Sequence, residues 1–281
     1  MQKTKKTFKE WLTQEKLETK ALFKDIPAIP FAAVCISFIL MNLLATVALY
    51  NEWWIAGDMG IIVSWISFLS CDALVKRYSV KGAIKIQIAA LLVALVTLGI
   101  LAAGSAIENA LYAEYIASGE YYPMLSLFSW EFNVDNGMVT LWTTGASAAA
   151  FILATIFNAI ISNKILLKFR KRTSFKAYAT AAYISTFVGQ FVDNMVFAFL
   201  FTFFASRIGL WGMSPLTVLA LVTCSLTGAV LELIFEIVFS PIGFKLAEKW
   251  REQGIGAEYI ALVPEAQEIN SNTDCVVDVI G

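Results

Sequence analysis

Lysine and arginine residues are confined almost entirely to every second polar segment between six long apolar runs. Of the 21 such residues, 20 lie in four of these segments, and Arg207 is the exception. Short basic loops remain in the cytoplasm because the translocation of Lys and Arg is disfavoured. The pattern predicts an all-α integral membrane protein, a compact bundle of six transmembrane helices with both termini in the cytoplasm. The four basic segments are residues 1–27, 76–85, 164–176 and 245–251.

The chain divides into three expected parts. Residues 1–27 form a cytoplasmic helix that lies on the membrane surface, because its apolar residues share one face among lysines. Residues 28–244 form the six-helix transmembrane domain, and Pro241 with Gly243 is expected to break its last helix. Residues 245–281 are a cytoplasmic amphipathic extension and a disordered acidic tail. The expected spans, each close to the length that a bilayer requires, are about residues 29–50, 59–75, 84–107, 143–167, 178–204 and 215–239.

The composition excludes several classes of soluble protein and enzyme. The chain has 281 residues, of which 58% are hydrophobic and only 15% are charged, and a soluble domain needs a more polar surface. It contains no histidine, and its four cysteines are scattered singly, without metal-ligand spacing. We therefore expect no enzymatic activity, no cofactor and no metal site. The basic asymmetry reports membrane topology, so no nucleic-acid partner is expected.

Acidic and amide side chains within the last two spans are candidates for a transport site, because a charge in hydrocarbon costs about 3 kcal/mol. In the fifth span, Thr186, Gln190 and Asp193 fall on one helical face. In the sixth, Glu232 and Glu236 lie one turn apart. No basic residue lies at comparable depth. These acids indicate a cationic substrate, a bound proton or both, although water in a central cavity is the alternative.

Further candidates lie in the earlier spans. Asn42 is a hydrogen-bonding candidate in the first span, and Trp65 in the second could either stack on a planar ligand or simply pack. Asp72 ends the second span, where an interfacial ion pair with Lys76 and Arg77 and a role in gating are both open. Two amides in the fourth span, Asn158 and Asn163, are weaker candidates of the same kind.

The segment Ser185-Thr186-Phe187-Val188-Gly189-Gln190-Phe191-Val192-Asp193 resembles the S-T-x-x-[GS]-[QN]-x-x-D signature of the queuosine precursor transporters, also called the vitamin uptake transporter family. Asn42 in the first span, Asp72 at the end of the second and Ser240-Pro241-Ile242-Gly243 after the sixth agree with that family. The resemblance covers about residues 28–250, including the number and orientation of the helices.

The resemblance implies a six-helix carrier that imports 7-deazaguanine precursors of the tRNA nucleoside queuosine by alternating access. Aminomethyl-deazaguanine and queuine carry a protonated amine, which the acidic surplus favours. Asp193 with Gln190 would bind the guanine-like edge, and Glu232 would meet the amine. Some members have Gly where this chain has Ser79, and some have Lys in the sixth span near the position of Glu232.

These arguments define a set of expected site residues and partners. The expected substrate-binding residues are Asn42, Trp65, Thr186, Gln190, Asp193, Asn194 and Glu232, and the expected gate or proton-coupling residues are Asp72 and Glu236. The expected partners are a 7-deazaguanine and the lipid bilayer of a bacterial cytoplasmic membrane, and the sequence leaves a homodimer open.

Three alternative functions compete with the carrier. The main one is the substrate-binding subunit of an energy-coupling-factor importer, which would need a transmembrane partner and ATPases. An intramembrane enzyme is disfavoured by the lack of histidine, and a structural protein would have no use for acids within the membrane.

The role of the outer segment at residues 108–141 stays open between a lid, a short helix and an interfacial aromatic patch.

Overall fold

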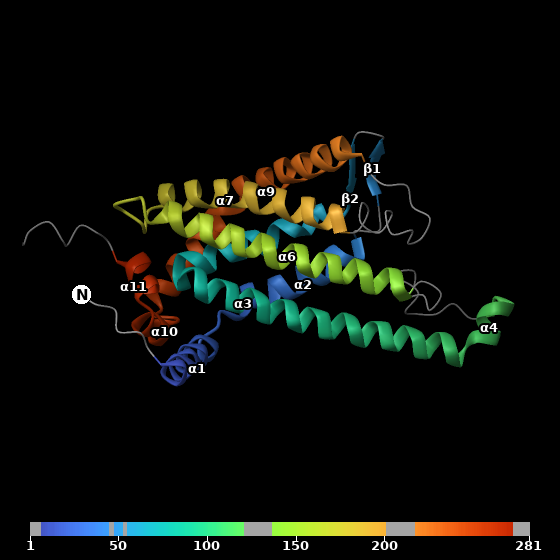
Figure 1. Cartoon of the computed structure of the whole chain (residues 1–281), viewed down its shortest axis with the longest axis horizontal. Coiled ribbons are helices and arrows are strands. Elements are labelled where there is room, and N and C mark those ends of the chain that lie inside the picture. Colours follow the sequence, from blue (N-terminus) through green and yellow to red (C-terminus); the bar gives the residue numbers. More distant parts are fainter. Residues whose placement is uncertain (1–6, 45–47, 53–54, 121–136, 201–216, 272–281) are drawn as a thin grey trace, which may run out of the picture.

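The computed structural model describes residues 7–44, 48–52, 55–120, 137–200 and 217–271. These residues form a helical bundle with one small β-hairpin (Figure 1), so the expected helical class is confirmed. The elements in chain order are α1 (Phe8–Lys24), α2 (Ala28–Leu44), β1 (Ala48–Glu52), β2 (Ile55–Asp58), α3 (Ile61–Leu111), α4 (Ala113–Ser118), α6 (Gly137–Leu166), α7 (Phe175–Ala198), α9 (Val218–Glu252), α10 (Ala257–Leu262) and α11 (Pro264–Asn270).

The long helix α3 folds back on itself at Ser79. This residue has φ 63° and ψ −177°, outside the helical region. Gln87 Nε2 donates a hydrogen bond to the Ser67 carbonyl oxygen at 3.0 Å, although the two residues are 20 positions apart. In a straight helix they would be separated by about 30 Å. α3 is therefore two arms, a first arm (residues 61–78) and a second arm (residues 80–111), that lie side by side (Figure 1).

The four basic segments of the sequence meet at one end of the bundle, which we call the basic end. It holds α1, the turn at Ser79, the connection from α6 to α7, and α10 with α11 (Figure 1). Lys81 forms an ion pair with Glu15 of α1 at 2.6 Å, and Lys24 forms one with Glu258 of α10 at 2.7 Å. Both ends of the described chain therefore lie on the same side of the bundle.

At the opposite end, a β-hairpin replaces the last turns of the first expected span. α2 ends at Leu44, and residues 48–52 of β1 pair antiparallel with residues 55–58 of β2. The expected helix to residue 50 is wrong there, because the backbone groups of the segment are paired between two strands instead of along a helix. Trp53 and Trp54 lie outside the described residues. α4 adds a short helix to the outer segment, and residues 121–136 of that segment are likewise outside the described range.

The last bundle helix continues through Pro241, where a break was expected. α9 runs to Glu252 with Pro241 inside it. Proline lacks the N–H that would bond the carbonyl of Ile237, but the Ser240 hydroxyl donates to that carbonyl at 3.3 Å. Gly243 lets α9 approach Tyr178 of α7, because a Cβ there would collide with the tyrosine hydroxyl. The helix therefore stays continuous.

The tail is folded up to residue 271, so the expected disorder is wrong for that part. α10 and α11 bury Tyr259, Val263, Ala266 and Ile269 against the basic end, and Tyr259 packs on Tyr78 of α3. The acidic composition of the segment hides these regularly placed apolar residues, whose burial offsets the entropy of ordering the chain. Residues 272–281 lie outside the described range.

The bundle has the exposed apolar surface of a membrane protein. Within the described residues, α3, α6 from Thr144 and α9 are each long and apolar enough to cross a membrane, and α1 with α2, bent by 93°, would make a fourth candidate. α7 falls short of this group because Gln190, Asp193 and Asn194 lower its hydropathy. The outer faces expose large aliphatic side chains, which water would penalise and lipid would not. Examples are Leu92, Val96, Ile100, Ile234, Val238 and Ile242.

Candidate functional site

Asp72 is the centre of a buried hydrogen-bond cluster that joins three helices. It lies on the first arm of α3 and is 1% exposed. Its Oδ1 accepts hydrogen bonds from Asn158 Nδ2 on α6 and Ser185 Oγ on α7, each at 3.2 Å. Its Oδ2 accepts one from Thr186 Oγ1 at 3.1 Å, and the Ser162 hydroxyl also bonds the carboxylate. Neutral donors thus hold this carboxylate inside the bundle.

The structure rejects the alternative in which Asp72 forms an interfacial ion pair. Lys76 pairs with Glu248 of α9 at 3.2 Å. Arg77 donates twice to the Ile255 carbonyl, at 2.8 Å from Nε and 2.6 Å from Nη2. α9 and the segment that follows it supply these partners at the basic end, so both basic side chains are engaged there.

Glu236 on α9 is a second buried carboxylate with a different environment. It is 0% exposed, and neither of its oxygens has a hydrogen-bond partner within the described residues. The charge that acts on it is that of Asp72. The hydroxyl of Tyr178, which interacts electrostatically with both acids, is also buried and without a partner in the part of the chain described. A charged carboxylate in such a place is costly, so the site suits a proton or a donor from a ligand.

Glu232 lies one turn before Glu236 on α9 and contacts the first arm of α3, which also carries Asp72. Ser64 Oγ donates a hydrogen bond to Glu232 Oε1. Farther along that arm, the Ser67 and Ser37 hydroxyls are 2.6 Å apart, which links α3 to α2. The first arm of α3 therefore presents polar groups to α2, α6, α7 and α9 and lies at the centre of the bundle.

The face of α7 that carries Thr186, Gln190 and Asp193 is buried. Thr186 bonds Asp72 as described, and one turn later Gln190 is 0% exposed with no partner for either amide atom among the described residues. Asp193 is also buried. Close packing explains the intervening glycine: a Cβ on Gly189 would lie 2.8 Å from Phe68 Cε1 of the first arm. The pattern that the sequence analysis singled out is thus a helix face turned into the bundle.

The contacts of the remaining expected residues are with groups outside the hydrogen-bond cluster of Asp72. The ring of Trp65 stacks on Phe239 of α9 with centroids 4.2 Å apart, so that face is already occupied. Asn42 donates to the Phe38 carbonyl of its own helix at 2.8 Å. Asn194 lies against Gly228, where a Cβ would come within 2.6 Å of its amide nitrogen.

Sequence reasoning did not single out two partners of Asp72, Ser162 and Ser185. Ser185 opens the family-like motif, which could have marked it. Ser162 follows Asn158 by one helical turn in the fourth apolar run, so a search for polar pairs at that spacing would have found it.

Residues 58–246 match the family described as "Putative vitamin uptake transporter". The chain belongs to this family. The matched region contains both arms of α3, α6, α7 and most of α9, which carry every residue of the Asp72 cluster together with Glu232 and Glu236. No curated protein and no solved structure matches the chain. As a member of the vitamin uptake transporter family, this multi-pass membrane protein has membrane transport, not catalysis, as its implied function.

Proposed function

We propose that the chain is a stand-alone secondary carrier that imports a queuosine precursor, a 7-deazaguanine such as aminomethyl-deazaguanine or queuine, for tRNA modification. The observation that carries the proposal is Gln190, whose fully buried amide has no partner among the described residues and lies between Thr186 and Asp193 on one helix face. A buried unpartnered amide costs free energy unless a ligand satisfies it. Membership of the transporter family and the motif from Ser185 to Asp193 support the substrate class.

The carrier would cross a bacterial cytoplasmic membrane six times, with both termini inside. α2, the two arms of α3, α6, α7 and α9 supply the six passes. The fold-back of α3 supports this count, because its two arms lie side by side. The meeting of all four basic segments at one end supports a cytoplasmic orientation for that end.

Substrate recognition would divide between α7 and α9. A guanine-like edge presents N–H donors and a carbonyl acceptor. The Asp193 carboxylate would accept from the donors, and the amide of Gln190 can both accept and donate. Glu232, already oriented by Ser64, would bind the protonated amine of the substrate.

Asp72 and Glu236 would couple transport to a proton. Hydrogen bonds hold the Asp72 carboxylate, whereas Glu236 has no donor of its own within the described residues. Two neighbouring buried carboxylates repel one another, so one of them is best neutralised. We assign the proton to Glu236 and its release to the arrival or departure of the substrate.

The test uses a bacterial host that lacks both queuosine synthesis and its own precursor importer. The protein is expressed, nanomolar aminomethyl-deazaguanine or queuine is supplied with the enzymes that use each, and queuosine in tRNA is measured. We expect restored tRNA modification, and its loss in Asp193→Asn. Thr97→Val is the control, because the Thr97 hydroxyl donates to the Val93 carbonyl of its own helix and has no other bond to the described residues.

No restoration with any precursor, despite membrane expression, would refute the proposed substrate. Restoration that depends on co-expressed ATPases, or co-purification with them, would favour the subunit of an energy-coupling-factor importer. Uptake that is undiminished in Asp193→Asn would remove that residue from the site.

A further inference from the structure

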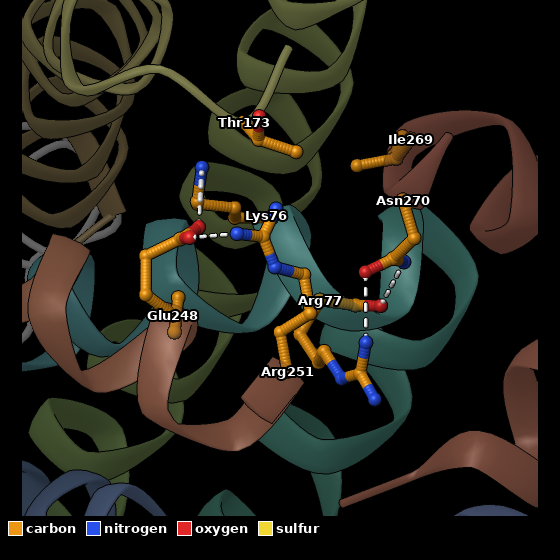
Figure 2. A pocket seen from close by; sticks show the side chains of 8 residues that line it. Lys76, Arg77, Thr173, Glu248, Arg251, Ile269 and Asn270 are labelled. Atoms are coloured by element: carbon orange, nitrogen blue, oxygen red, sulfur yellow. Dashed lines mark hydrogen bonds and ion pairs between the residues drawn. The ribbon is translucent and has the colours of Figure 1, made fainter. Parts of the chain in front are cut away.

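Three of the eight residues that line a hollow at the basic end are cationic (Figure 2). It lies where the first arm of α3, the connection before α7, the end of α9 and α11 meet, and its cavity volume is about 10 Å³ with the Glu248 side chain in place. Its polar lining consists of Lys76, Arg77, Thr173, Glu248, Arg251 and Asn270. None of these residues belongs to the polar cluster around Asp72.

The charges around the hollow do not balance. Three cations and one carboxylate line it, and Lys76 and Arg77 are each only 5% exposed. The Glu248 carboxylate is shared: Oε1 lies 3.2 Å from Lys76 Nζ, and Oε2 pairs with Arg251. Arg251 also repels both Lys76 and Arg77 electrostatically. One carboxylate thus serves three positive charges in a partly desolvated place, where an added anion would be favourable.

The fold holds the least exposed guanidinium in a fixed position. Arg77 donates to the Ile255 carbonyl through Nε and Nη2, and its Nη1 donates to Asn270 Oδ1 at 2.9 Å. Asn270 Nδ2 in turn donates to the Arg77 carbonyl at 2.9 Å. Because these bonds order the side chain in advance, a ligand that meets it loses less conformational entropy.

We propose that this hollow binds a phosphate group, with Lys76, Arg77 and Arg251 as its cationic contacts and Glu248 as the resident counter-ion that the phosphate displaces. Guanidinium and ammonium groups together are the usual protein partners of phosphate. Basic pockets between helices at a membrane end bind the head groups of anionic lipids, and a free phosphate offers the same chemistry. The proposal does not depend on which substrate is carried.

The first experiment measures the thermal midpoint of the purified full-length protein in detergent while one additive is titrated. The additives are phosphatidylglycerol, phosphatidylcholine with the same acyl chains, and inorganic phosphate against chloride at equal ionic strength. Phosphatidylglycerol or inorganic phosphate is expected to raise the midpoint saturably, and phosphatidylcholine is not. A response to the lipid alone identifies a head-group site, and a response to inorganic phosphate identifies a soluble anion.

Variants then test the residues. Arg251→Gln is expected to weaken the apparent affinity about tenfold, since a lost charged contact of about 1.4 kcal/mol has that effect. Glu248→Gln is expected to strengthen it, because the competing carboxylate is gone. Lys249→Gln removes one positive charge from an exposed neighbouring position outside the lining and is the matched control.

Arg251→Gln and Glu248→Gln are expected to change the anion affinity in opposite directions, so either variant alone tests the proposal. If Arg251→Gln does not fold, the Glu248→Gln titration decides. The proposal is overturned if neither anion raises the midpoint of the wild type saturably, or if Glu248→Gln and Lys249→Gln both respond as the wild type does. The cluster would then be a salt bridge that only fastens the tail.

Discussion

Thr186 Oγ1 donates a hydrogen bond to Asp72 Oδ2 at 3.1 Å, which ties α7 to the first arm of α3 inside the bundle. Thr186→Val keeps the shape of the side chain but removes the donor. We expect it to lower the free energy of unfolding by about 2 kcal/mol, the usual contribution of a hydrogen bond to a charged group. Thr186→Ser keeps the hydroxyl and should lose less. Unfolding of the purified variants in detergent measures both, and equal losses would contradict a role for the hydroxyl.

Ser79 is the one non-glycine residue with a positive φ among the described residues, and it forms the turn between the arms of α3. Glycine has no Cβ to strain this conformation, so Ser79→Gly is expected to raise the free energy of unfolding by about 1 kcal/mol. Ser70→Gly, inside the regular helix of the first arm, is expected to lower it by about 0.5 kcal/mol. The thermal midpoints of the two variants should therefore move in opposite directions, and a loss in both would argue against strain at Ser79.

The glycine of the α7 motif is expected to be intolerant of a methyl group. In Gly189→Ala the new Cβ would lie 2.8 Å from Phe68 Cε1 and 3.1 Å from Asn158 Cβ, so the helices must move apart. We expect a loss of about 2 kcal/mol, typical of overpacking. Gly99→Ala is the control, because nothing lies within 4 Å of its Cβ position, and it should be neutral or slightly stabilising. Equal thermal midpoints for the two variants would refute the packing argument.

The contact between α1 and α3 should weaken in acid. Hydrogen bonds from Lys81 and then Lys85 hold the pKa of Glu15 below its ordinary value of 4.5. A carboxyl whose pKa is lower in the folded state contributes stability above its unfolded pKa, and that stability is lost as the pH falls through the folded value. We therefore expect α1 to loosen below about pH 4.5. A spin label at Thr13 would report the mobility of α1. In Glu15→Gln, α1 should already be mobile at neutral pH and should show no further transition in acid. A transition unchanged in that variant would point to another group.

Glu236→Gln tests the proposed proton coupling. The amide has nearly the same shape but cannot exchange a proton, so uptake of queuine into proteoliposomes should no longer move protons. A pH-sensitive dye inside the vesicles measures this movement. Glu252→Gln, at the exposed end of the same helix, should leave it unchanged. Proton movement that persists with queuine uptake in Glu236→Gln would assign the coupling to another group.

Local patterns in the sequence were sufficient to predict the helical class of the protein and much of its organisation. Apolar runs between basic segments predicted where helices lie, and the bundle gathers these basic segments at one end. The spacing of Thr186, Gln190 and Asp193 predicted one helix face, and all three are buried. Hydropathy and helical periodicity are properties of neighbouring residues, so they can be read without knowing what covers each face.

Contacts between distant residues depended on the assembled bundle. Asp72 accepts a hydrogen bond from Asn158, 86 positions away. Arg77 donates one to the carbonyl of Ile255, 178 positions away. A local pattern marks a side chain as buried or polar but does not specify its partner. For the same reason Asp72 was as compatible with an ion pair to Lys76 as with its actual place. Only the packing of α3 against α6, α7, α9 and the tail selects among such partners, because the cost of burial is offset where complementary groups meet.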